Sequence, residues 1–144
     1  MRRRRARRTV EELLSRIVEV RSVRPYISVH PMGGRGEEPR IECGSWLDVQ
    51  GDLDDPVKDV FGITISVHPE EPLKVGTARP VAVGAIIGIR DDVSAVVALL
   101  PVDFDCLWAL ALSGHLKFAS LTFTPPKFRS ALVVNTSFSS EREE

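Results

Sequence analysis

Apolar residues near the N-terminus follow a helical spacing. They recur at the i, i+3, i+4, i+7 positions of one face: Val10, Leu13, Leu14, Ile17 and Val18. Thr9, with Glu12 three residues later, forms a capping box at the start of this stripe. The pattern predicts an amphipathic helix over residues 10–20. We expect its apolar stripe, which includes Leu13 and Ile17, to dock on the domain or on a protein partner.

After Arg21 the period shortens toward two, which is typical of strands. Alternation predicts strands that end at His30 and that cover residues 41–49, with a bulge at Gly44, and 61–68. Two runs are apolar on both faces, at 81–89 and 94–102, with Asp91 and Asp92 as the turn between them. We expect this pair to form the central strands of a sheet. Two more strands are expected at 116–123 and 130–138.

A second helix is predicted over residues 103–113. The segment is rich in Leu, Phe and Trp, with Asp103 as a candidate N-cap and Gly114 at the position that follows the last turn. About seven strands with these two helices predict a mainly β domain. We expect an antiparallel β-sandwich or a strongly curved sheet.

One short motif occurs twice. Ile27–Pro31 reads Ile-Ser-Val-His-Pro, and Ile65–Pro69 repeats it. Because proline cannot donate to a strand ladder, we interpret the two copies as equivalent strands that end in the same way. In both, Ile and Val share one face, so His30 and His68 should face outward near strand ends.

Charge divides the chain into unequal parts. Arginine occupies six of the first eight positions: Arg2, Arg3, Arg4, Arg5, Arg7 and Arg8. The remaining residues hold 13 basic and 20 acidic side chains, a net charge of −7. We expect a disordered arm over 1–8, one domain over 9–140 and a charged tail over 141–144.

The arm suggests nucleic-acid binding without sequence preference and with a steep salt dependence. Two observations count against it. The acidic body repels phosphate, and the chain prefers Arg to Lys throughout, 15 against 4, so the arm can equally reflect codon usage. The body itself, in the same or a neighbouring chain, is another candidate partner for the arm.

A third hypothesis is a metal- or calcium-dependent binder or enzyme. Its candidate ligands are His30, His68, Asp52, Asp54 and Asp55. Asp55–Lys58 and Val102–Asp105 resemble the calcium loops of C2 domains, which are β-sandwiches that bind membranes. A further aspartate expected after the second segment is absent, and the spacing of an EF-hand is absent too. The alternative is that these aspartates lie in solvated turns.

Catalytic templates are missing from the sequence. It has neither a Gly-x-Ser-x-Gly elbow nor a phosphate-binding loop. Cys43 and Cys106 are too few and too far apart for a disulfide framework, so we expect reduced thiols in a cytoplasmic protein with no cofactor.

The preferred function is therefore a non-enzymatic protein-binding or assembly module. It would use a sheet face, an edge strand or the predicted N-terminal helix, and self-association is one form of it. Trp46 is a candidate contact residue because it falls on the polar side of its strand.

Overall fold

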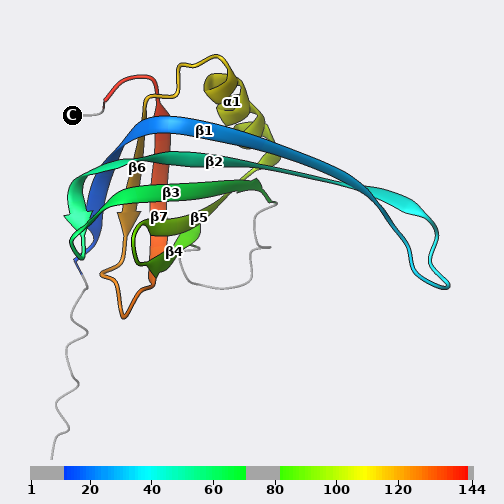
Figure 1. The fold of residues 1–144 in the computed structure, drawn as a ribbon, viewed down its shortest axis with the longest axis horizontal. Coiled ribbons are helices and arrows are strands. Elements are labelled where there is room, and N and C mark those ends of the chain that lie inside the picture. The colour runs from blue at the N-terminus through cyan, green and yellow to red at the C-terminus, as the bar shows by residue number, and fades with distance from the viewer. Residues whose placement is uncertain (1–11, 71–81, 143–144) are drawn as a thin grey trace, which may run out of the picture.

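The strands predicted from alternation are present in the computed structural model, which describes residues 12–70 and 82–142 (Figure 1). Seven strands and one helix form in these residues: β1 (Leu14–Met32), β2 (Arg40–Val57), β3 (Val60–Pro69), β4 (Gly84–Ile89), β5 (Val93–Leu99), α1 (Pro101–Leu112), β6 (Phe118–Phe123) and β7 (Ala131–Ser139). The strands close into a barrel in the order β1-β2-β3-β5-β4-β7-β6.

The predicted mainly β fold of about seven strands is confirmed, but the sheet is mixed and closed and is not an antiparallel sandwich. β3 and β5 run parallel, while the other neighbours are antiparallel. The hairpin of β4 and β5 enters the barrel with β5 against β3, so β4 reaches β7 instead. Closure pairs β1 with β6, and no strand is central in a closed sheet.

The predicted N-terminal helix is wrong. Leu14–Glu19 pairs antiparallel with β6 as the first part of β1. Leu14 and Val18 lie four residues apart, a spacing that places two side chains on one face of either a helix or a strand. Arg16 distinguishes a strand from a helix here, because residues two apart share a face only in a strand. Its side chain lies on the same side of β1 as Leu14 and Val18 and donates to the carbonyl oxygen of Pro56 at 3.3 Å. Thr9 and Val10 lie outside the described residues.

β1 runs from the barrel into an arm. It pairs with β6 only through Glu19 but with β2 as far as Met32, and a register shift lies between Val20 and Ser22. The shift changes which residues face the interior, from even to odd positions. The bulge predicted at Gly44 is absent, since Gly44 pairs with Ser28 in regular register.

The core fills the interior of the barrel. Its fully enclosed side chains come from all strands: Val18, Leu47, Val49, Ile63, Ile65, Val67, Ile86, Val93, Val97, Leu121, Phe123 and Val133. α1 adds Phe104, Leu107 and Ala111, so the buried helix predicted near 103–113 is confirmed. It begins at Pro101 rather than at Asp103. It ends as predicted, with Gly114 at a φ of +78° and the N–H of His115 donating to the carbonyl of Leu110.

Gly51 permits β1 and β2 to approach closely at the register shift. A Cβ there would meet the carbonyl oxygen of Glu19 and would lie 2.7 Å from Val18 Cγ1. We expect Gly51→Ala to lower the free energy of unfolding by roughly 1–3 kcal/mol, because the backbone must move to accept the methyl group. Gly88→Ala is the matched control, since a Cβ at Gly88 meets nothing within 4 Å. Chemical denaturation measures both, and equal stabilities for the two variants would contradict this packing.

Candidate functional site

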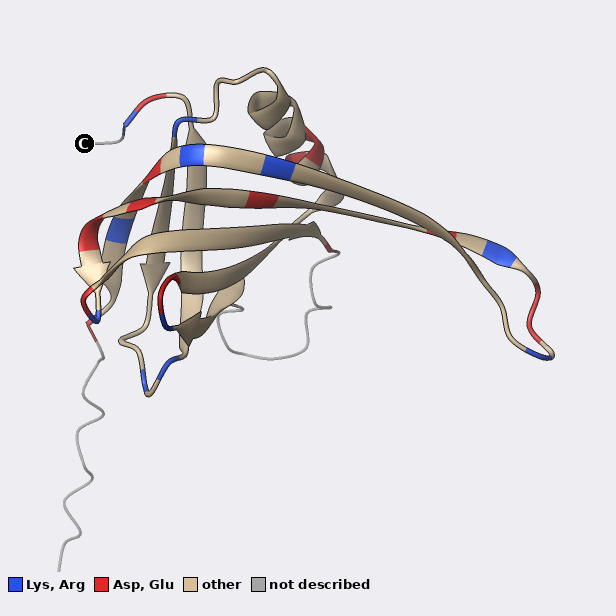
Figure 2. Ribbon diagram, viewed as in Figure 1, with Lys and Arg blue, Asp and Glu red and all other residues tan. Residues whose placement is uncertain are grey.

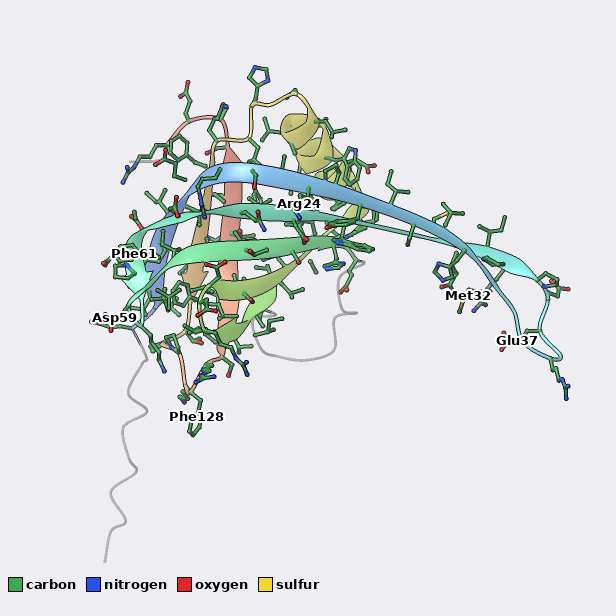
Figure 3. The ribbon with its side chains drawn as sticks, in the orientation of Figure 1. Arg24, Met32, Glu37, Asp59, Phe61 and Phe128 are labelled. Atoms are coloured by element: carbon green, nitrogen blue, oxygen red, sulfur yellow. The ribbon has the colours of Figure 1, made fainter. Side chains whose placement is uncertain are left out.

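The β1–β2 arm, residues 27–32 with 40–45, protrudes from the barrel and is the most prominent feature of the described residues (Figure 1). β3 pairs with β2 only from Leu47 onward, so the two longer strands continue past the barrel as a two-stranded ribbon (Figure 1). Met32 and Glu37 mark its far end in Figure 3. An isolated ribbon of two strands is marginally stable in water, so this arm depends on the barrel at its root.

One face of the arm is apolar and uncovered among the described residues. Ile27, Val29 and Ile41 expose 70%, 63% and 72% of their surface. Register places Val29 opposite Cys43 and Pro31 opposite Ile41, and residues directly opposite share a face. This face continues the side of β1 and β2 that is buried inside the barrel. We call it the apolar strip: Ile27, Val29, Pro31, Ile41 and Cys43.

The duplicated motif shows what is unusual about the apolar strip. In β3, the second copy buries Ile65 and Val67 completely in the core. In β1, the first copy exposes Ile27 and Val29 to solvent. The same five residues therefore serve as core in one strand and as surface in the other. Our interpretation that both strands end alike is wrong for β1, which continues past Pro31 to Met32, whereas β3 ends at Pro69.

The opposite face of the arm is polar and begins with a row of stacked rings. Trp46 stacks on Tyr26 with ring centroids 4.9 Å apart and on His68 with centroids 6.1 Å apart. Trp46 lies between the other two rings, and its contact with His68 joins the root of the arm to β3. Farther out, Glu42 lies 3.5 Å from Arg40 and 4.0 Å from His30. Figure 2 shows that charges of both signs are distributed along the arm.

The two histidines are not brought together. His68 stacks on Trp46, which lies opposite Tyr26. His30 lies opposite Glu42, four residues farther along each strand of the arm. Within the described residues, no group of three or more His, Cys, Asp or Glu side chains could hold a metal ion.

The candidate aspartates of β2 have other partners. Asp52 contacts Arg21 at 3.0 Å, Asp54 accepts a hydrogen bond from the N–H of Ile17 at 2.9 Å, and Asp55 lies 3.8 Å from Arg16. These contacts tie β1 to the last part of β2. The second C2-like segment, Val102–Asp105, lies in the first turns of α1 and is not a loop.

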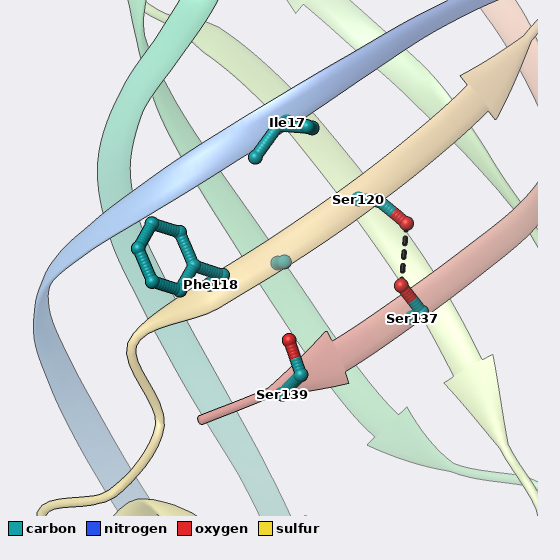
Figure 4. A pocket seen from close by; sticks show the side chains of 6 residues that line it. Ile17, Phe118, Ser120, Ser137 and Ser139 are labelled. Carbon is teal, nitrogen blue, oxygen red and sulfur yellow. Dashed lines mark hydrogen bonds between the residues drawn. The ribbon is translucent and has the colours of Figure 1, made fainter. Parts of the chain in front are cut away.

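The three candidate contact residues lie on different parts of the barrel and the arm. Leu13 precedes β1 and is exposed, and Ile17 faces outward over a hollow of about 10 Å³ beside β6 and β7 (Figure 4). That hollow is no larger than a water-sized probe. Trp46 lies at the root of the arm on its polar face, partly covered by its two ring neighbours. The six arginines of residues 2–8 lie outside the described part of the chain.

Other large apolar side chains are exposed on the barrel. Phe128 is 93% exposed at the β6–β7 turn, where the Lys58 Nζ donates to its carbonyl oxygen. Figure 3 shows Phe61 and Phe128 at the end away from the arm. A cavity of about 260 Å³ lies beside this turn, lined by Thr124, Pro125, Lys127, Ser130, Ala131 and Leu132. The one titratable side chain in this lining is that of Lys127.

Sequence reasoning missed the apolar strip. Ile27 and Val29 alternate as core residues do, and nothing local separates them from Ile65 and Val67. The available signal was strand length. The segments that pair as β1 and β2 are longer than the β3 segment beside them, so their far ends extend beyond the barrel.

The paired copies of the motif supply a test. Ile27→Thr should change the free energy of unfolding by less than about 0.5 kcal/mol in dilute solution, since the side chain touches no core residue. Ile65→Thr should cost roughly 2–4 kcal/mol, because it removes buried apolar surface and buries a hydroxyl. Denaturant melts compare the two, and a similar loss in both would mean that the strip is part of the folding core.

No protein-family model, curated protein or solved structure matches this chain. Among the described residues, no helix is long and apolar enough to cross a membrane.

Proposed function

We propose that this protein is a non-enzymatic interaction module that binds another protein chain through the β1–β2 arm. The observation that carries the proposal is the apolar strip. Three large aliphatic side chains, Ile27, Val29 and Ile41, lie together on one face of a protruding ribbon. Apolar side chains that lie singly on a surface need no explanation, whereas a continuous apolar strip is typical of an interaction site.

Energetics supports a binding role over a folding role. Burying a Val or Ile side chain contributes about 1.5–3 kcal/mol, and in the single chain the arm forgoes most of this at three positions. A partner chain that contacts the strip recovers part of it. The stacked rings of Tyr26, Trp46 and His68 hold the arm root in place before binding, which lowers the entropy lost on association.

Photo-crosslinking from the strip tests this function. We would replace Val29 in the full chain with p-benzoylphenylalanine, irradiate living cells of the source organism and identify the adducts by mass spectrometry. We expect one dominant adduct with a defined protein chain, because a partner chain lies against the arm in the bound state. Phe61 is the matched control: it is an exposed aromatic residue on the barrel, away from the arm. Absence of an adduct from Val29, or the same adducts from both positions, would refute the proposal.

A further inference from the structure

β2 has a free edge along the arm. Ile41–Ser45 pairs with β1 on one side, and no described strand lies on the other, because β3 pairs with β2 only from Leu47 onward. A free edge presents unpaired N–H and C=O groups, and another strand can add to it.

Two prolines show which backbone groups this edge presents. Pro25 lies opposite Leu47 and Pro31 opposite Ile41, in a register without interruption from Ser22 to Met32. Proline has no N–H, so in an intact antiparallel ladder each proline and its partner on β2 form a pair without hydrogen bonds between them. In such a pair the N–H and C=O groups of both residues point away from the partner strand. Ile41 and Cys43 therefore present these groups at the free edge of β2.

The free edge of β1 is different. In a regular strand, residues two apart direct their backbone groups to the same side, so Pro25, Ile27, Val29 and Pro31 face this edge together. Two of these four positions lack an N–H, which blocks strand addition along β1. Addition to the arm is therefore directed to β2.

The charge pattern of the β2 edge is complementary to itself. Arg40 and Glu42 flank Ile41, and both side chains reach solvent on the polar face. If two copies of this edge pair antiparallel about a twofold axis at Ile41, Arg40 of each copy lies opposite Glu42 of the other. Ile41 then meets Ile41 on the apolar face.

Neighbouring registers fit less well. A twofold axis at Glu42 would place two carboxylates opposite each other. An axis at Cys43 would bring Ile41 of the second copy opposite Ser45. That place is next to Pro69 of β3 when the β2–β3 register is continued, so the second copy would collide with the end of β3. The axis at Ile41 avoids both problems, since its pairing ends where Cys43 meets Pro39.

We infer that the partner of the arm is a second copy of this chain, joined edge to edge through β2 with the twofold axis at Ile41. This inference rests on the proposed function and names its partner. The pairing is closed, because the two β2 edges satisfy each other and the edge of the arm that remains, that of β1, carries the two prolines. It places Ile41 of one copy against Ile41 of the other, sets the two apolar strips side by side on one face of the joined sheet, and flanks Ile41 with two reciprocal ion pairs.

Charge reversal in the full-length protein tests the pairing by sedimentation velocity over a wide concentration range. We expect the wild type to dimerise. Arg40→Glu or Glu42→Arg alone should raise the dimer Kd by at least about tenfold, because two attractive contacts become repulsive. Mixing these two variants should restore a dimer with near wild-type Kd, and so should the double variant with both reversals. Arg21→Glu, which alters an exposed ion pair with Asp52 on the barrel, should leave the Kd unchanged.

The outcomes separate the two proposals. A wild type that stays monomeric at every concentration overturns the second copy as partner. If it dimerises but the reversals have no effect, or mixing fails to restore the dimer, the edge pairing is overturned. In either case an adduct from Val29 to another protein would leave the proposed function standing. Near-ultraviolet circular dichroism confirms that each variant is folded.

Discussion

The pairing of β1 with β2 is the interaction on which the rest of the structure depends. Its first part holds the barrel closed, because the same stretch of β1 also pairs with β6. Its second part continues outside the barrel, where neither strand has another described neighbour. The register shift after Val20 joins the two parts, and Gly51 allows β2 to pass close to β1 at that point. One continuous ladder thus makes both a rigid body and an exposed arm.

Most strands could be predicted because alternation is a local signal. The apolar runs that became β4 and β5, and the Gly114 that ends α1, followed from sequence alone. The predicted helix over 10–20 failed because the spacing of Leu14 and Val18 fits both periods, and pairing with two strands outweighs a weak local preference. Barrel closure and the parallel contact of β3 with β5 depend on long-range pairing, which alternation does not encode.

The candidate site was predictable only in part. Trp46 was expected on the polar side of its strand, and it lies there, but its neighbours Tyr26 and His68 come from strands whose order the sequence does not reveal. Ile27 and Val29 have the pattern of core residues, and their exposure follows from where β3 ends. The two prolines of β1 have a further consequence: they close one edge of the arm and leave the edge of β2 as the place where a strand can add.

Amide hydrogen exchange measured by NMR shows whether the β2 edge of one chain is covered by another. We expect exchange at Ile41 and Cys43 to slow as the protein concentration is raised. Gly44 should show no such change, because its N–H points toward β1 within the same chain. If exchange at Ile41 and Cys43 stays as fast as in an unpaired strand at every concentration, the β2 edge is not covered by a second chain.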